Sequence, residues 1–336
     1  MALEKDILTR FRPAQRLRRL RQSHAIRDMI EENALRVQDM IWPVFIREGE
    51  NIREPIASLP GVNRLSLDVL EDEVKRARDL GIRTICLFPK TDDSAKTHDC
   101  AEAWNENNLT NRALRRLSAA VPDVALMTDI ALDPYNALGH DGIVRDGKII
   151  NDETVECLVK QALVQAESGA DILGPSDMMD GRIAAIRDAL ETQDMGHVVI
   201  LSYAAKYASG FYGPFRDAVG ASGALKGDKK TYQINPANRA EAMRCVERDI
   251  NEGADMVMIK PGMPYLDMCA RIKDTFDVPT FAYQVSGEYA MIMAGVQNGW
   301  VDQETAVMES LLCFKRAGCD GILTYFAPFA AEVLSR

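Results

Sequence analysis

The feature that most restricts the fold is a regular alternation of short apolar runs with longer amphipathic segments. Segments with helical periodicity, such as 66–81, 153–170 and 303–319, precede several of the runs, and each ends near a glycine. Eight strand and helix units in a row predict an α/β fold of the (β/α)8 TIM barrel type. The eight predicted strands are 41–46, 82–89, 124–130, 170–175, 197–203, 256–261, 279–285 and 321–326.

The composition of the runs favours a parallel sheet that is covered on both faces. Strands buried on both faces are continuously apolar, as are VVILSY at 198–203 and MVMIK at 256–260. A doubly wound open sheet is the alternative fold, and it usually has a glycine-rich phosphate loop after an early strand. The residues that follow the first two runs are IRE at 46–48 and FPK at 88–90, so the barrel is favoured.

Residues 1–35 are expected to form an extended N-terminal arm, and 36–336 the catalytic barrel. The arginine-rich arm would also suit a transit peptide or a nucleic-acid-binding arm. Acidic residues such as Glu4, Asp6 and Asp28 argue against both, so we expect a homo-oligomer in which the arm packs on an acidic neighbouring subunit. The arginines are Arg10, Arg12, Arg16, Arg18, Arg19 and Arg21.

The overall composition argues against several partners. A formal net charge of −10 is unsuited to nucleic acid, whose phosphates are held mainly by clustered lysine and arginine. The apolar runs are all shorter than the ~20 residues of a membrane helix, so no membrane is expected. The seven cysteines are scattered and never form CxxC, and no apolar signal-peptide core follows the N-terminus. These features predict a cytoplasmic protein.

Polar side chains gather where the predicted strands end. The C-terminal ends of the strands of a TIM barrel face one shared cavity, which is where such enzymes place their catalytic residues. We therefore expect these side chains to lie close together. They are Asp129, Ser176, Asp177, Lys206, Lys260, Ser286 and Tyr325.

Two of these residues, Lys206 and Lys260, end neighbouring apolar runs. Burial disfavours an ammonium, and each positive charge disfavours the other, so we expect lowered pKa values and nucleophilic amines. A salt-bridged or snorkelling side chain is the alternative for either lysine alone. Two lysines on adjacent strands predict Schiff-base chemistry on ketones.

A polar, glycine-rich segment at about 207–233 separates the two lysines. Segments of this length are lids or solvated surface loops. Cations on a lid would hold carboxylates, and closure would exclude the water that hydrolyses imines, so we favour an active-site lid. The cations are Arg216, Lys226, Lys229 and Lys230, and the aromatic residues are Phe211, Tyr212 and Phe215.

Four motifs resemble those of the delta-aminolevulinic acid dehydratase (porphobilinogen synthase) family, and the resemblance runs from the arm to the final strand. It implies a lyase that condenses two 5-aminolevulinate molecules to porphobilinogen, with loss of two waters, in heme and chlorophyll biosynthesis. It also implies an octamer or a hexamer of arm-hugging dimers. The motifs are SYAAKYASGFYGPFR (202–216), IKPGMPYLD (259–267), GPSDMMDGR (174–182) and YQVSGEYAM (283–291).

The resemblance also implies a role for each candidate residue. Lys260 resembles the lysine that binds the P-side substrate as an imine, and Lys206 resembles the A-side lysine. Ser286 and Tyr325 are expected to hold the P-side carboxylate, and Arg216, Lys229 and Gln233 the A-side carboxylate. Asp129 and Ser176 are expected to contact the A-side amino group and ketone. Tyr212 and Phe215 are further expected substrate contacts.

One segment, MTDIALDPYNALGHDG at 127–142, departs from the zinc-dependent members of the family. Those members have three cysteines where this chain has Ala131, Asp133 and Asp141. Zinc prefers thiolate or imidazole ligands, so we expect neither zinc nor another metal cofactor. Mg²⁺ or a monovalent cation, held through water by His140 and the two aspartates, is the alternative.

Two further departures concern regulation and substrate grip. Cys245 stands where magnesium-stimulated members have a glutamate, and a thiol is a poor magnesium ligand. We therefore expect no allosteric magnesium site, although Glu241 and Glu247 are near in sequence. Lys229 stands where arginine is more common, which weakens the expected grip on a carboxylate.

The predicted mechanism begins with an imine between the first substrate and Lys260, after which Lys206 captures the second. A neighbouring amine or Asp129 then moves the C3 proton, and Asp133 and Asp141 stabilise positive charge on the A-side substrate. A class I aldolase, which needs one imine lysine, is the alternative enzyme. A catalytically inactive binding barrel is the non-enzymatic alternative.

Overall fold

The computed structural model describes residues 16–220, 225 and 227–336. The chain divides into two compact units, with the boundary between Ala34 and Leu35. The described part of the first unit contains η1 (Leu17–Arg21) and α2 (His24–Met29), and the Ser23 hydroxyl caps α2 by accepting the N–H of Ile26. Residues 1–15 of the predicted arm lie outside the described residues, and packing of the arm between subunits stays a prediction.

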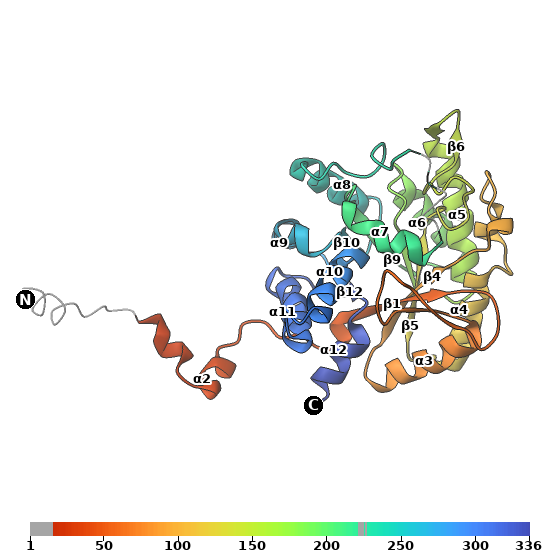
Figure 1. Cartoon of the computed structure of the whole chain (residues 1–336). Helices are drawn as coiled ribbons and strands as arrows, with labels where there is room; N and C mark the ends of the chain where they lie inside the picture. The colour runs from red at the N-terminus through yellow and green to blue at the C-terminus, as the bar shows by residue number, and fades with distance from the viewer. Residues whose placement is uncertain (1–15, 221–224, 226) are drawn as a thin grey trace, which may run out of the picture. The chain divides into compact units, whose positions relative to one another are not determined.

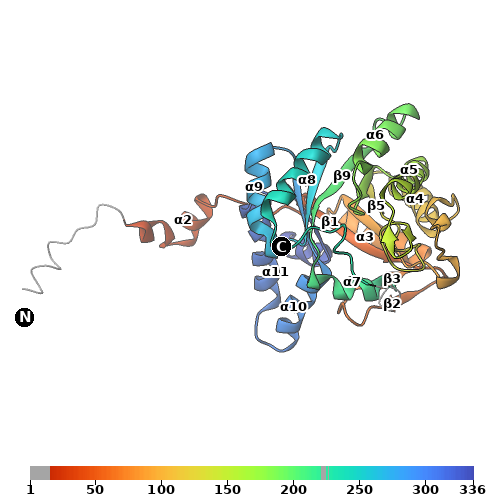
Figure 2. The same cartoon turned by 90° about the horizontal axis from the view of Figure 1, so that it is seen from above.

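Eight parallel strands close into a barrel in the second unit (Figures 1 and 2). Each strand pairs with the next, and β12 pairs with β1 through Ile322 and Met40, which closes the sheet. The predicted α/β class and (β/α)8 TIM barrel are therefore confirmed. The barrel strands are β1 (Met40–Ile46), β4 (Thr84–Pro89), β5 (Ala125–Ile130), β8 (Ile172–Pro175), β9 (Val199–Lys206), β10 (Met256–Lys260), β11 (Thr280–Gln284) and β12 (Gly321–Thr324).

Helices alternate with these strands and surround them in both views (Figures 1 and 2). Most of them bury apolar side chains against the barrel, as α3 does with Leu70 and Val74. The α-helices are α3 (Leu67–Asp79), α4 (Leu109–Ala120), α5 (Asn151–Glu167), α6 (Arg182–Thr192), α7 (Gly213–Ala218), α8 (Arg239–Asn251), α9 (Leu266–Phe276), α10 (Ser286–Gln297), α11 (Gln303–Arg316) and α12 (Ala327–Leu334). Short 3-10 helices are η2 (Val37–Asp39), η3 (Asp93–Ala95), η4 (Ala101–Trp104), η5 (Gly210–Tyr212) and η6 (Met263–Tyr265).

Four short strands form two hairpins beside the barrel. Strands β2 (Arg53–Pro55) and β3 (Asn63–Leu65) pair antiparallel, and β3 also pairs with β1. Strands β6 (Val144–Arg145) and β7 (Lys148–Ile149) form a separate sheet. The two hairpins lie in the connections after β1 and β5, and so lengthen the loops at the C-terminal ends of those strands.

The barrel strands begin and end within a few residues of the predicted runs, and the main difference is at β9. This strand was predicted to end at 203 but continues through Ala204 and Ala205 to Lys206. Alanine has a low strand propensity, but pairing with β10 overrides it. Lys206 is thus the last residue of β9, and it pairs in register with Lys260, the last residue of β10.

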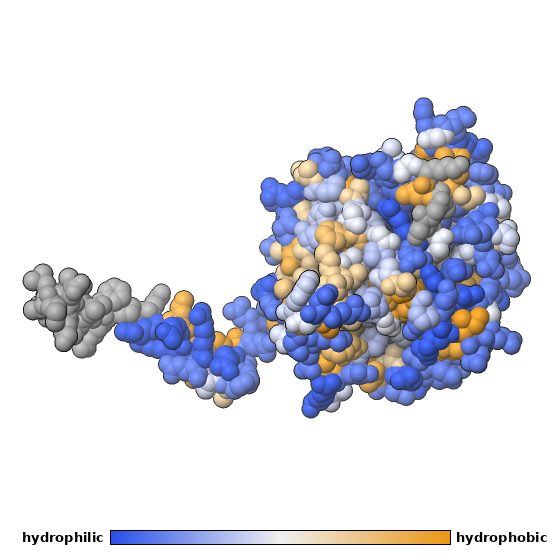
Figure 3. Space-filling view, in the orientation of Figure 1, coloured by the Kyte–Doolittle hydropathy of each residue, from blue (hydrophilic) through white to orange (hydrophobic). Residues whose placement is uncertain are grey.

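The exposed surface is mainly hydrophilic on the face shown in Figure 3, with hydrophobic residues in small patches. Large exposed apolar side chains include Met291 and Trp300. Within the described ranges, no helix is both long and apolar enough to cross a bilayer.

A buried ionic network joins α6, α8 and β9 on one side of the barrel. The guanidinium of Arg182, which is fully buried, donates to Asp249 at 2.7 Å and to the Ser202 hydroxyl at 3.3 Å. Ser202 in turn donates to Asp249 at 2.6 Å. Buried charges are costly unless each is paired, so removal of one partner leaves the other uncompensated.

We predict that Asp249→Ala lowers the free energy of unfolding by about 3–5 kcal/mol, because Arg182 stays buried without its nearest carboxylate. Urea unfolding followed by circular dichroism measures the loss. Asp188→Ala, at an exposed position of α6, is the matched control and should change stability by less than about 0.5 kcal/mol. Equal stability of the two variants would refute the role of the network.

Candidate active site

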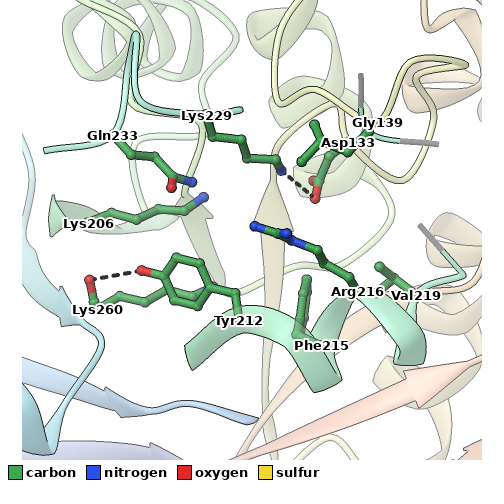
Figure 4. Close-up of a pocket in the computed structure, with 11 residues that line it drawn as sticks. Asp133, Gly139, Lys206, Tyr212, Phe215, Arg216, Val219, Lys229, Gln233 and Lys260 are labelled. Atoms are coloured by element: carbon green, nitrogen blue, oxygen red, sulfur yellow. Dashed lines mark hydrogen bonds and ion pairs between the residues drawn. The ribbon is translucent and has the colours of Figure 1, made fainter. Parts of the chain in front are cut away.

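Lys206 and Lys260 lie side by side at the C-terminal end of the barrel and line one cavity (Figure 4). The predicted lid segment contributes much of the remaining wall. The other lining residues are Asp133, Gly139, Tyr212, Phe215, Arg216, Val219, Leu225, Lys229 and Gln233. The structure therefore brings the two lysines together with five of the predicted substrate-binding residues.

The amine of Lys260 is enclosed by aromatic rings. Burial, and next the charge of Lys206, lower its pKa to about 8. Among the described residues, no carboxylate lies within ion-pair distance of Lys260 Nζ. The shift has the direction expected from the sequence, and it leaves a free amine available near neutral pH. The ring centroids lie 4.6 Å (Tyr283), 5.0 Å (Phe215), 5.1 Å (Tyr203) and 5.5 Å (Tyr212) from Nζ.

Lys206 has a different environment from its neighbour. Its Nζ donates to Asp141 Oδ1 at 3.0 Å and to the backbone carbonyl of Ser176. Lys206 thus adopts the salt-bridged arrangement that was the alternative for a single lysine. The cause is Asp141, which lies in the connection between β5 and α5 and reaches the end of β9.

The lid residue Lys229 contacts the same carboxylates. Its Nζ lies 3.3 Å from Asp133 Oδ2 and 2.5 Å from Asp141 Oδ2. Burial would lower the pKa of Lys229, but the two carboxylates raise it above its ordinary value. Burial would raise the pKa of Asp141, but Lys206 and Lys229 hold it well below the usual range. Tyr232 also donates to Asp141 Oδ2, at 2.9 Å.

These contacts decide which ions the aspartates could hold. Zinc does not fit, since Ala131 offers no ligand and Asp133 and Asp141 are hard donors. Both carboxylates already contact the ammonium of Lys229. In the described part of the chain, no three histidine, cysteine, aspartate or glutamate side chains are grouped closely enough to hold a metal.

The predicted lid begins as a helix and is not a plain loop. Helix α7 carries Phe215 and Arg216, and the Tyr212 hydroxyl just before it donates to the Lys260 carbonyl at 3.1 Å (Figure 4). At the C-terminal end of α7, Arg64 donates to the carbonyls of Asp217 and Ala218, each at 2.6 Å. The lid is therefore fixed to β10 and to the β2–β3 hairpin. Lys226, a predicted lid cation, lies outside the described residues.

Ser286 and Tyr325 are buried beside the cavity and do not line it. The Ser286 hydroxyl accepts the backbone N–H of Phe215 at 2.9 Å and donates to the Phe211 carbonyl at 3.4 Å. The Tyr325 hydroxyl lies 2.8 Å from that of Tyr283. The start of the lid thus covers Ser286, whereas Tyr325 packs against the rings of Phe45, Tyr283 and Tyr289.

Asp129 and Ser176 lie at the C-terminal ends of β5 and β8. Burial raises the pKa of Asp129 to about 6, although Lys260 acts in the opposite direction. Its Oδ1 has no hydrogen-bond partner among the described residues. An unpartnered carboxylate oxygen near the two lysines suits a proton acceptor. Ser176 contributes its backbone carbonyl to Lys206.

Several residues of the site were missed from the sequence. Tyr203 and Tyr283 have the appearance of ordinary strand residues, and only their inward direction brings them to Lys260. Arg64 lies on a strand of three residues with no motif around it. Alternation along β11 could have indicated the inward direction of Tyr283. On β9, the register shift against β10 breaks the alternation between Tyr203 and Lys206, so no sequence signal identifies Tyr203.

The chain matches the family model for delta-aminolevulinic acid dehydratase over residues 14–333. The chain belongs to this family. It is 61% identical to the enzyme of Rhodobacter capsulatus over 322 residues, 96% of this chain and 97% of that one. It is 58% identical to the Bradyrhizobium diazoefficiens enzyme over 321 residues, 96% and 91% of the two chains.

A solved structure agrees with the family assignment. The Toxoplasma gondii porphobilinogen synthase, solved in complex with its reaction product porphobilinogen, superposes with a TM-score of 0.94 at 47% identity, covering 96% of this chain and 92% of that one. Membership in a dehydratase family decides against the class I aldolase alternative.

The pKa of Lys260 predicts how imine formation depends on pH. Only the unprotonated amine attacks a ketone, so trapping of the keto acid levulinate by cyanoborohydride should increase as the pH rises through about 8 and then level off. Mass spectrometry of the Lys260 peptide measures the rate. A midpoint near the ordinary lysine value of 10.5 would contradict the lowered pKa.

Proposed function

We propose that the chain is a porphobilinogen synthase that condenses two 5-aminolevulinate molecules to porphobilinogen, with loss of two waters, in tetrapyrrole biosynthesis. The observation that carries the proposal is the in-register pair Lys206 and Lys260, which line one cavity in a chain of this family. The product bound to the Toxoplasma gondii relative supports it.

Each lysine would form an imine with the C4 ketone of one substrate, and each imine releases one water. C3 of the A-side molecule then bonds to C4 of the P-side molecule, and the P-side amino nitrogen bonds to C4 of the A-side molecule. Both lysines leave as amines, so the waters lost in forming the imines account for the two lost overall. Holding both substrates in one cavity makes the condensation effectively intramolecular.

The proposal assigns different tasks to the two lysines. Lys260 has the lowered pKa and no carboxylate partner among the described residues, which suits the first attack on a ketone. Lys206 is paired with Asp141, and the negative charge of this carboxylate can stabilise the iminium that forms on Lys206. The unpartnered oxygen of Asp129 is the candidate acceptor for the C3 proton.

Substrate carboxylates would be held at the two sides of the cavity. Arg216 and Gln233 line the wall proposed for the A-side carboxylate, and Lys229 reaches the same cavity while it contacts Asp133. On the P-side, the Ser286 hydroxyl would donate to the carboxylate once its long bond to the Phe211 carbonyl is exchanged. Closure of the lid over both sides would exclude water.

The proposal includes catalysis without a metal cofactor. The ammonium of Lys229 lies between Asp133 and Asp141, two of the three positions where zinc-dependent relatives have cysteines. It supplies fixed positive charge there. The cytoplasmic location and the assembly as an octamer or hexamer of arm-hugging dimers stay predictions from the sequence.

We predict that Lys260→Ala and Lys206→Ala each lower kcat at least about 1,000-fold, because each removes the nucleophile for one substrate. Pyrrole formation is measured colorimetrically. Lys230→Ala changes an exposed lysine of the same lid and should retain wild-type activity. Borohydride with 5-aminolevulinate should give a secondary amine at Lys260; product formation with no adduct on either lysine would disprove the mechanism.

Metal independence is tested by chelation. We expect activity to survive exhaustive EDTA treatment and not to increase with Zn²⁺ or Mg²⁺, because Lys229 supplies the charge at the aspartates. Pyrrole formation before and after treatment, with metal content determined by mass spectrometry, measures the effect. Strict dependence on either ion would overturn this part of the proposal.

A further inference from the structure

Glu288 is a buried carboxylate for which the mechanism above has no use. It lies in the first turn of α10 with 2% of its surface exposed. Its partners are three backbone N–H groups, from Val285 at 2.8 Å, Met263 at 2.6 Å and Gly262 at 3.1 Å. No cation in the described residues lies within ion-pair distance, so three peptide dipoles alone solvate this side chain.

The positions of these donors link Glu288 to the active site. Gly262 and Met263 are the second and third residues after Lys260, where the chain turns from β10 into η6. Val285 directly precedes Ser286, at the turn from β11 into α10. One carboxylate therefore joins the turns that follow two neighbouring barrel strands.

Both turns are packed too tightly to move independently. A Cβ on Gly262 would lie 2.6 Å from the Phe314 ring and 2.8 Å from the Tyr283 carbonyl. A Cβ on Gly287 would lie 2.5 Å from the Phe211 carbonyl oxygen of the lid. Any shift at Glu288 would therefore be transmitted along these turns to the two active-site residues beside it.

We propose that Glu288 is a positioning residue, whose carboxylate fixes the turn after Lys260 to the start of α10 and so sets the distance between the Lys260 amine and the Ser286 hydroxyl. The inference rests on the roles proposed above for these two residues. It assigns to Glu288 no contact with substrate. Small displacements at reacting groups can cost about 100-fold in rate, so a fixed spacing matters for catalysis.

The cost of this carboxylate to the fold supports a role beyond stability. Burial raises the pKa of Glu288 to about 7, while the three N–H groups act in the opposite direction. The folded state therefore binds more protons than the unfolded state between the ordinary value of 4.5 and about 7, so stability falls as the pH rises through this window. Above that pH, the ionised side chain lowers the stability of the barrel.

The test compares Glu288→Gln and Glu288→Asp in the full-length enzyme. Glutamine replaces one carboxylate oxygen with N–H₂, so either the N–H of Met263 or those of Gly262 and Val285 lose their acceptor, whereas aspartate keeps the charge. We expect Glu288→Gln to lower both kcat and the rate of levulinate trapping at Lys260 by about 10- to 100-fold at pH 8. Glu288→Asp should recover part of both. Glu304→Gln, on an exposed carboxylate of α11, is the control and should match wild type.

Stability measurements separate positioning from folding. The thermal midpoint of Glu288→Gln at pH 8 should change little, because removal of the costly charge offsets the loss of an acceptor for a buried N–H. Unchanged kcat and trapping in that variant, or a loss equal to the fraction of unfolded protein, would overturn the inference. If Glu288→Gln does not fold, Glu288→Asp decides: slower trapping supports positioning, and wild-type trapping overturns it. Wild-type enzyme that forms no adduct at Lys260 would refute the proposed function instead.

Discussion

The register between β9 and β10 is the constraint on which the active site depends. Lys206 and Lys260 are 54 residues apart in sequence, and they meet because parallel pairing places each at the end of its strand as the partner of the other. A shift of one residue would turn one of the two amines to the outer face of the barrel. The register shifts by one residue between Val257 and Ile259, and beyond this shift Lys260 pairs with Lys206, so the position of the chemistry depends on this irregularity in the sheet.

The charges around the two amines are arranged unequally. Asp141 contacts both Lys206 and Lys229, whereas aromatic rings surround Lys260. Two similar amines on equivalent strand ends therefore differ in readiness to react, and the difference comes from one connection, between β5 and α5.

Much of the architecture could be predicted from the sequence because periodicity and burial are local properties. The eight apolar runs predicted the eight barrel strands, and Lys260, at the end of MVMIK, was recognisable as a costly buried charge. The end of β9 was not predictable, since the alanines before Lys206 have no strand preference of their own. The Lys206–Asp141 pair spans 65 residues, and no sequence pattern indicates it. Contacts made through direction and register, such as those of Tyr203, need the folded chain.

The hydrogen bonds of Ser286 have a consequence for ligand selectivity. Its hydroxyl accepts a firm bond from the Phe215 N–H at 2.9 Å, but its own hydrogen points to a carbonyl 3.4 Å away. The bond that this hydroxyl accepts is thus shorter than the one it donates, which leaves its hydrogen ready to bind another acceptor. An ionised acid offers only acceptor oxygens, whereas an amide also brings hydrogens that find no acceptor here. If Ser286 binds a substrate carboxylate as proposed, the lid backbone would therefore favour a free acid over its amide.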